Sequence, residues 1–145
     1  MKSKVALFIG LVFAAWMFNA AAEDAKAYTE GSVTQISYIK VKPGKFDDYM
    51  KYLDTTYKAV MEASKKAGLI LGYRVFSAQA RSPREPDLIL TVTYANMAAL
   101  DKTDEGDAVA AKVVGSMDVR NKGAIDREAL RELLGGELVR ELILK

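Results

Sequence analysis

The sequence predicts an α+β fold in which a strand-helix-strand unit occurs twice, and three observations lead to this prediction. Residues 33–41 have the composition of a strand and are followed by a Pro43-Gly44 turn. The turn leads into a long helix with one apolar face, which ends at Gly68. The rest of the chain again has the pattern strand, strand, helical segments and strand, so its second half resembles the first.

The first unit consists of a strand at 33–41 and a helix that follows the turn. Pro43 cannot donate to a sheet ladder, so the chain leaves the sheet at that point. Both faces of the strand mix apolar and polar residues, which suits a strand covered on both sides. Gly68 follows Lys65 and Lys66, an order typical of a helix end. The apolar helix positions, spaced by three or four residues, are Phe46, Tyr49, Met50, Leu53, Tyr57, Val60 and Met61.

The second unit begins with strands at 69–79 and 87–95. The polar segment 80–86 between them is too short for a crossover helix, so the two strands are predicted to pair antiparallel. In the later strand one face consists of four apolar or aromatic residues, which we assign to the side that meets the helices. These residues are Leu88, Leu90, Val92 and Tyr94.

Helical segments follow, and the last of them is the least sharply bounded. Asn96 is a good N-cap for a short helix over 97–101. Helical spacing then continues to Gly115. A further helix is predicted over 118–134, ended by Gly135-Gly136, with a final strand over 137–144. That last segment could instead continue the helix, but the double glycine and the apolar composition favour a strand.

This element order is that of a ferredoxin-like βαββαβ domain. With right-handed crossovers and the strands numbered in chain order, the antiparallel four-stranded sheet has the order 4-1-3-2 and carries its helices on one face. We expect the other face to present Val33, Ile39, Val41 and Ile89, together with part of the last strand. An apolar patch of that size is unusual in water, so the sequence predicts a homodimer in which a second sheet covers it.

The N-terminus has the order of residues found in a secretory signal peptide. Lys2 and Lys4 precede an apolar run over 5–18, and small alanines follow. An uncleaved membrane anchor is the alternative, but the run is shorter than the roughly 20 residues of a spanning helix. The prediction is therefore a signal peptide 1–22 cleaved after Ala22, a flexible lead-in 23–31 and a single domain 32–145. The protein is expected to be periplasmic or secreted and to have no membrane contact after cleavage.

Composition excludes several classes of function. Lys2 and Lys4 are two of the 21 basic residues, so the cleaved chain has 19 basic and 19 acidic residues and no net charge. Nucleic-acid binding needs a basic surface, so no nucleic-acid partner is expected. The chain has no cysteine, which excludes a lipidated cysteine, a disulfide, a thiol nucleophile and a cysteine metal site.

Two short stretches suggest a family. The turn Val41-Lys42-Pro43-Gly44-Lys45-Phe46, with the apolar helix behind it, resembles the first βα unit of the dimeric α+β barrel superfamily, and the element order is similar from 32 to 145. That superfamily includes antibiotic-biosynthesis-type monooxygenases, stress-responsive barrel proteins and NIPSNAP-like proteins. Through the same turn and the ending Gly136-Glu137-Leu138-Val139-Arg140-Glu141-Leu142, the chain also looks similar to small secreted bacterial proteins of uncharacterised function.

The resemblance implies two sheets that meet across a dimer to form a barrel, and a cavity between sheet and helices in each protomer. Haem-binding relatives generally use a histidine, and this chain has none, so a histidine-ligated haem and a histidine base are excluded. Oxygenase relatives that need no cofactor use Asn, Trp and Tyr around the substrate. The one tryptophan here, Trp16, lies in the predicted signal peptide.

Acidic residues gather near one glycine but do not predict a metal site. Without histidine or cysteine, only carboxylates remain as strong ligands, which suits Ca²⁺ or Mg²⁺. The cluster lacks the ligand order of an EF-hand loop and reads as a solvated turn with helix-capping carboxylates. No metal and no cofactor are therefore predicted. Its members are Asp101, Asp104, Glu105 and Asp107, around Gly106.

Three arginines of the last predicted helix form one stripe, with Asn121 beside it. Arg120, Arg127 and Arg131 are spaced so that their guanidinium groups could hold a carboxylate or phosphate. The alternative is a solvated helix face in which Glu128 pairs with Arg131, and this alternative is favoured because charged stripes on helices are usually exposed.

Polar residues of the predicted sheet offer a second candidate site. In the order 4-1-3-2 the first and third strands are neighbours, so tyrosines and arginines on matching faces could converge in a cavity. The alternative assigns the tyrosines to the core and Arg140 to an ion pair with Glu137 or Glu141 across a dimer. The predicted ligand-binding residues are Tyr38, Tyr73, Arg74, Tyr94, Arg120, Asn121 and Arg140; the polar residues around them are Gln35, Ser37, Thr91 and Thr93.

No phosphate-binding loop, hydrolase elbow or dinucleotide fingerprint occurs in the sequence. The leading hypothesis is therefore an exported dimeric α+β barrel protein that binds a small apolar or amphipathic molecule. One alternative is a monooxygenase or isomerase that needs no cofactor and uses tyrosine and arginine in the cavity. Another is a structural partner in an envelope assembly.

Overall fold

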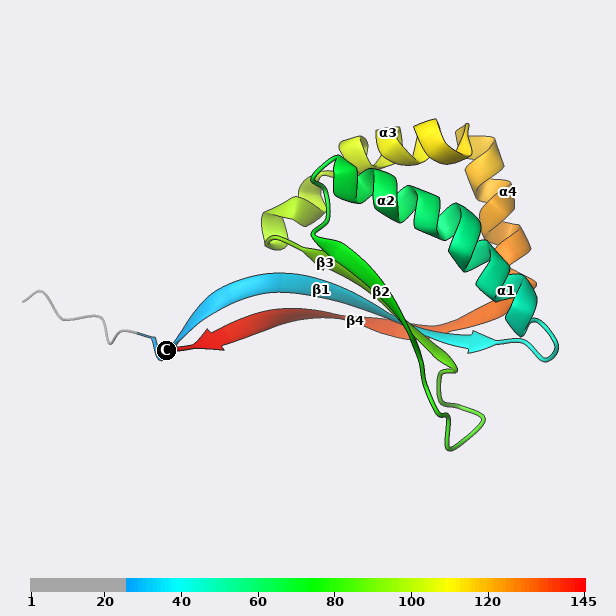
Figure 1. Cartoon of the computed structure of the whole chain (residues 1–145), viewed down its shortest axis with the longest axis horizontal. Helices are drawn as coiled ribbons and strands as arrows, with labels where there is room; N and C mark the ends of the chain where they lie inside the picture. The colour runs from blue at the N-terminus through cyan, green and yellow to red at the C-terminus, as the bar shows by residue number, and fades with distance from the viewer. Residues whose placement is uncertain (1–25) are drawn as a thin grey trace, which may run out of the picture.

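The computed structural model describes residues 26–145, which form one four-stranded antiparallel sheet with helices on one face (Figure 1). The predicted signal peptide and its cleavage site lie outside the described residues. The strand order is β2-β3-β1-β4, which is the predicted 4-1-3-2 read from the opposite edge. The strands are β1 Tyr28–Val41, β2 Gly72–Ser77, β3 Leu88–Tyr94 and β4 Arg131–Leu144.

The predicted long helix is present as three continuous segments: α1 Phe46–Tyr52, the π-helical turn η1 Leu53–Tyr57, and α2 Lys58–Lys66. Gly68 follows with a φ of 71°, a conformation that favours glycine, and its N–H donates to the Lys65 carbonyl at 3.0 Å. The predicted helix end is confirmed. The antiparallel pairing of β2 with β3 is confirmed as well.

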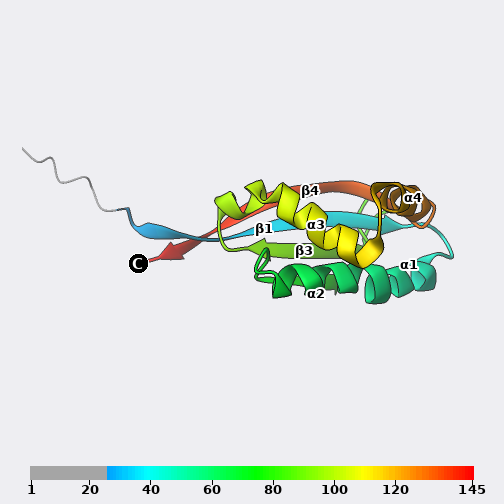
Figure 2. The ribbon, with the colours of Figure 1, turned by 90° about the horizontal axis from the view of Figure 1, so that it is seen from above.

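The remaining helices are η2 Met97–Asp101, α3 Thr103–Val114 and α4 Met117–Glu128. The Asn96 side chain accepts a hydrogen bond from the Ala99 N–H at 3.1 Å, so the predicted N-cap is confirmed. Gly115 follows the last residue of α3, as predicted. Seen from above, α3 lies between α2 and the β4 side of the sheet, and α4 continues toward the start of β4 (Figure 2).

The predicted role of Gly135-Gly136 is wrong. The last helix ends at Glu128 and β4 begins at Arg131, so the glycine pair lies inside a strand and not at a helix end. The pairing with β1 shifts by one residue at Leu134, which is a β-bulge. A Cβ at Gly136 would lie 2.5 Å from the Ile36 carbonyl oxygen. The glycine is needed for this close backbone approach, a long-range contact that the local sequence does not reveal.

The predicted assignment of the two faces of β1 is also wrong. Ile39 and Val41 belong to the buried core under the helices, where they meet Tyr49 and Leu53 of the long helix and Leu88 and Leu90 of β3. Val33 has the same parity and is completely buried. Ile36 and Tyr38 therefore lie on the opposite face, together with Ile89. Of the four residues predicted for the face away from the helices, only Ile89 lies there. Both faces of β1 mix apolar and polar residues, so alternation alone could not decide which one the helices cover.

We call the sheet face that carries the helices the helix face and the opposite one the bare face. The core lies on the helix face. The assignment of Leu88, Leu90, Val92 and Tyr94 to this face is confirmed, because the first two belong to the core and the other two line a small cavity beneath α2 and α3.

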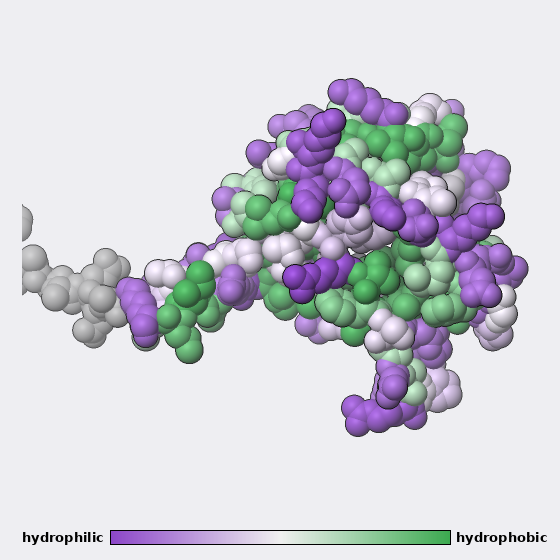
Figure 3. Space-filling view, in the orientation of Figure 1, coloured by the Kyte–Doolittle hydropathy of each residue, from purple (hydrophilic) through white to green (hydrophobic). Residues whose placement is uncertain are grey.

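Strands β1 and β4 continue beyond the helices as a two-stranded ribbon (Figure 1). Residues 28–30, predicted as part of a flexible lead-in, pair with 142–144 of β4. The ribbon carries exposed apolar side chains, of which Leu144 is 80% exposed, and Figure 3 shows hydrophobic surface near its tip. The lead-in prediction failed here because the small and polar residues at this end gain order from pairing with a distant strand.

Candidate ligand-binding site

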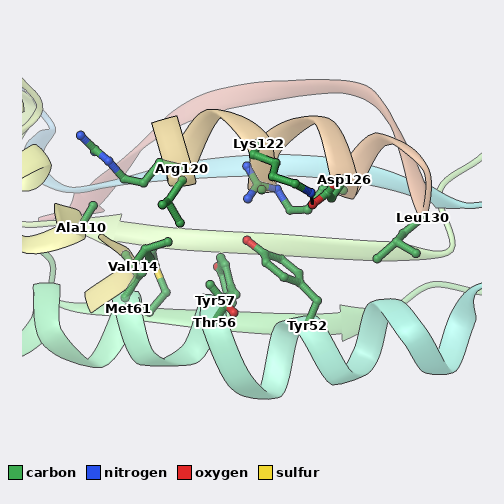
Figure 4. A pocket seen from close by; sticks show the side chains of 14 residues that line it. Tyr52, Thr56, Tyr57, Met61, Ala110, Val114, Arg120, Lys122, Asp126 and Leu130 are labelled. Atoms are coloured by element: carbon green, nitrogen blue, oxygen red, sulfur yellow. Dashed lines mark hydrogen bonds and ion pairs between the residues drawn. The ribbon is translucent and has the colours of Figure 1, made fainter. Parts of the chain in front are cut away.

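A pocket of about 570 Å³ lies within the helix layer, between the long helix on one side and α3 and α4 on the other (Figure 4). Its surface is mainly apolar, and its charged groups come from α4. The long helix contributes Tyr52, Thr56, Tyr57, Val60 and Met61; α3 contributes Ala110 and Val114; α4 and the turn after it contribute Val119, Arg120, Lys122, Gly123, Asp126, Arg127 and Leu130.

The π-helical turn lies directly opposite α4 in this pocket. The Thr55 hydroxyl donates to the Lys51 carbonyl at 2.7 Å, a side-chain bond that competes with the regular helix ladder. A π turn holds one more residue than an α turn, so it changes which side chains point toward α4. Figure 4 shows Tyr52 and Tyr57, at the two borders of the turn, extending toward α4. Single π turns are frequent at functional sites in helices.

Tyr57 brings a polar atom into this apolar setting. Its hydroxyl is buried and has no hydrogen-bond partner in the part of the chain that the structure describes. Burial raises the pKa of Tyr57 far above its ordinary value, and the neighbouring tyrosines, Tyr49 first, add to the increase. The hydroxyl is therefore neutral and available as a donor. The Tyr57 ring is fixed by an edge-to-face contact with Tyr73, with 5.8 Å between the ring centroids.

Two arginines of α4 line the pocket, and they differ in their interaction partners. Arg120 is only 19% exposed, and its Nη1 donates to Asp107 Oδ1 of α3 at 2.9 Å. Its Nε is buried and has no partner among the described residues. Arg127 places its guanidinium 5.2 Å from the centroid of the Tyr52 ring, a cation–π contact.

The predicted arginine stripe is therefore only partly correct. Arg120 and Arg127 share the pocket, but Arg131 is the first residue of β4 and lies in a separate hollow with Lys42 and Glu128. Asn121 is exposed and does not line the pocket. The stripe breaks because the helix ends before the third arginine.

The other predicted ligand-binding residues do not converge. Tyr38 and Arg74 lie on the bare face, whereas Tyr73, Tyr94 and Arg140 have the parity of the helix face. The Tyr73 hydroxyl donates to Glu62 at 2.8 Å, and the Tyr94 hydroxyl donates to Gln35 at 3.4 Å. Arg140 pairs with Glu30 of the same chain and with neither of the acids predicted for it. The sheet separates the first two side chains from the other three, so the five form no common cavity within one chain.

Tyr73 and Arg74 do share an open groove of about 830 Å³ around the β2 edge. Much of its lining is polar and includes Glu62, Lys65 and threonines of β1 and β3. It follows the outside of an edge strand and is lined from both faces of the sheet. We therefore regard the pocket between the helices, not this groove, as the candidate site.

From the sequence, Tyr52, Tyr57 and Gly123 were not identified as site residues, and Arg127 was considered only with the arginine stripe. Tyr57 was assigned to the apolar face of the long helix, and Arg127 to the arginine stripe. Their positions were therefore visible, but the meeting of these two helix faces was not, because it depends on how α4 folds back over the long helix.

The acidic cluster does not assemble. Asp107 pairs with Arg120. Asp104 and Glu105 lie in the first turn of α3, where the helix dipole stabilises negative charges. Within residues 26–145, no three His, Cys, Asp or Glu side chains come close enough to hold a metal ion. Over the same residues, no helix has the length and apolar character needed to cross a membrane.

No protein-family model matches this chain, and no curated protein matches its sequence. Among solved structures it is similar to HapK from Hahella chejuensis, with a TM-score of 0.49 and 12% identity, over 75% of this chain and 91% of that one. A likeness of this degree carries no information on function.

Proposed function

We propose that this protein binds a small apolar or amphipathic molecule in the pocket between the long helix and α4. The observation that carries the proposal is the pocket of about 570 Å³, whose walls are mainly apolar. One of its lining residues, Tyr57, has a buried hydroxyl without a partner among the described residues. Ligand pockets typically combine such walls with a few polar groups that orient the ligand.

Packing energetics support this proposal. The pocket is partly open to solvent, so its apolar walls are in contact with water when it holds no ligand, and burying that apolar surface favours binding. A buried polar group without a partner costs about 1–3 kcal/mol. A molecule that fills the pocket and accepts a hydrogen bond from Tyr57 removes both of these costs.

We further propose that the protein is an exported homodimer of the dimeric α+β barrel type. The leader sequence supports export. The bare face supports the dimer, because within residues 26–145 no helix covers Ile36, Ile89 or Phe76, and Phe76 is 45% exposed. Sedimentation velocity tests this proposal: we expect a dimer, and a stable monomer at micromolar concentration would contradict it.

Ligand binding can be tested by filling the pocket from a position that tolerates a side chain. Gly123 lies within α4, lines the pocket, and has no atom within 4 Å of an added Cβ. Gly123→Leu is expected to weaken binding of the neutral fluorescent probe N-phenyl-1-naphthylamine by about tenfold or more, because the side chain occupies the probe's space.

The matched control is Gly106→Leu. Gly106 is also within a helix and also has no atom within 4 Å of an added Cβ, but it does not line this pocket. Native probe affinity is expected in this variant. If both leucine variants bind the probe like the native protein, or if the native protein does not bind it, the proposed pocket function is wrong. If Gly123→Leu alone weakens probe binding, native mass spectrometry of the protein purified from its own source can identify the natural ligand.

A further inference from the structure

The pocket has a charge imbalance in addition to its apolar walls. Three basic side chains and one acidic side chain line it: Arg120, Lys122 and Arg127 against Asp126. In a partly enclosed site with low dielectric, an excess of one charge favours a ligand of the opposite charge more strongly than in open water.

Two of the three cations already have carboxylate partners. Lys122 Nζ lies 2.8 Å from Asp126 Oδ2, one turn away on α4. Arg120 pairs with Asp107 at 2.9 Å, and its Nη2 also donates to the Met117 sulfur at 3.6 Å. These two ion pairs neutralise the charges of Asp126, which lines the pocket, and of Asp107, which does not.

Arg127 is the cation that remains. It forms no ion pair with any residue of 26–145 and is placed by the Tyr52 ring instead. A cation–π contact engages the charge of the guanidinium and uses none of its N–H groups as hydrogen-bond donors to oxygen, so these donors remain available. A planar set of donors matches a carboxylate or a similar oxyanion, which can accept two hydrogen bonds at once.

Two residues that line the pocket also carry donors without a partner in residues 26–145. The Tyr57 hydroxyl and the Arg120 Nε are both buried and both lack partners among the described residues. An anionic oxygen accepts hydrogen bonds and donates none, so it satisfies such groups where a cation or a second donor would not.

We propose that the molecule bound in this pocket is an anion with an apolar body, whose acidic group is held by the Arg127 guanidinium and accepts a hydrogen bond from Tyr57. This inference rests on the proposed function, since it names the chemical class of the ligand for the same pocket. The apolar body would lie between the apolar side chains of the long helix and those of α3, with the acidic group on the α4 side.

Two fluorescent probes that differ by one charged group test the inference. N-phenyl-1-naphthylamine is neutral, and 8-anilino-1-naphthalenesulfonate has the same ring system with an added sulfonate. Titration of the purified protein with each probe gives the ratio of their dissociation constants. We expect the sulfonate to bind about tenfold more tightly, which is the size expected for hydrogen bonds to a charged group.

The variant Arg127→Gln is expected to bring this ratio close to one. Its matched control is Arg84→Gln, which removes an exposed loop arginine and leaves the ratio at its native value. If Arg127→Gln does not fold, as judged by circular dichroism, Arg127→Lys replaces it. Lysine keeps the charge but loses the planar donors, so the ratio is expected to fall about threefold.

The outcomes separate the two proposals. If both probes bind equally well and Gly123→Leu weakens both, the pocket binds ligands but the assignment to anions is wrong. If the Arg127→Gln variant still prefers the sulfonate probe, Arg127 is not the anion-holding group and the inference fails. The inference also fails if Arg84→Gln loses the preference to the same extent. If Gly123→Leu affects neither probe, the proposed function itself fails.

Discussion

The two faces of the sheet are formed by the same strands but differ completely in how they are covered. On the helix face, Ile39 and Leu88 are buried beneath Tyr49 and Leu53. On the bare face, Ile89 follows Leu88 directly in β3, yet no helix of residues 26–145 covers it. Successive residues of a strand point to opposite sides, so neighbours with similar hydrophobicity contribute to different surfaces.

This contrast shows what each side can do. The helix layer closes the core and also leaves a pocket between its own members, because α4 folds back over the long helix without filling all the space. The bare face has no such second layer in the described chain, so its half-buried apolar side chains are available to another sheet. The ligand binding and the self-association that we propose would therefore use opposite sides of the molecule.

The largest predicted effect compares neighbours on the two faces. Leu88→Ala is expected to lower the free energy of unfolding by about 2–5 kcal/mol, because it leaves a cavity in the core. Ile89→Ala is expected to lower it by only about 1 kcal/mol in the isolated chain, since this side chain is less buried than Leu88.

Urea unfolding at two protein concentrations measures both variants. In a dimer that covers the bare face, the effect of Ile89→Ala depends on concentration, whereas that of Leu88→Ala remains at every concentration. Equal losses in the two variants at all concentrations would break the proposed contrast between the faces.

A medium effect is expected for two glycines that differ in their surroundings. Gly136→Ala places a Cβ 2.5 Å from the Ile36 carbonyl oxygen, so the strands must separate, at a cost of about 1–3 kcal/mol. Gly123→Ala meets no atom within 4 Å and is expected to stabilise α4 by up to about 1 kcal/mol. Thermal unfolding followed by circular dichroism measures both changes. A tolerated alanine at 136 would contradict the close approach of β4 to β1.

The smallest predicted effect is a pH dependence at one end of the sheet. Asp87 accepts hydrogen bonds from Lys40 Nζ at 2.8 Å and from the Val41 N–H at 2.9 Å. The bond from Lys40 is the main cause of a lowered pKa of Asp87, and burial opposes it. A carboxyl group with a lowered pKa binds its proton more weakly when folded, so its stabilising contribution is complete above the unfolded pKa and is lost as the pH falls through the folded value.

The stability difference between the native protein and Asp87→Asn should therefore shrink as the pH decreases below about 4. Because the pair is partly exposed, with a side-chain exposure of 31% for Asp87, the difference at neutral pH is expected to be about 1 kcal/mol or less. The control Asp54→Asn alters an exposed helix pair and should show a still smaller difference. A difference that grows toward low pH would contradict this role of Asp87.

The sequence by itself determined the features that depend on neighbouring residues. The periodicity of the long helix, its end at Gly68 and the cap at Asn96 all arise from interactions within a few residues, and the structure confirms them. The short connection between β2 and β3 required antiparallel pairing. These elements, together with the handedness of crossover connections, were enough to give the strand order.

Tertiary structure alone decided which face of β1 is buried, what Gly135-Gly136 does, and where a pocket forms. Each of these depends on residues far apart in the chain: Ile39 on Tyr49 and Leu88, Gly136 on Ile36, and Tyr57 on the helix that contains Arg127. Periodicity identifies an apolar face but not the surface that it meets, because that choice is made by the packing of whole elements. For this reason Arg120 and Arg127 could be singled out from the sequence, whereas their shared pocket with Tyr57 could not.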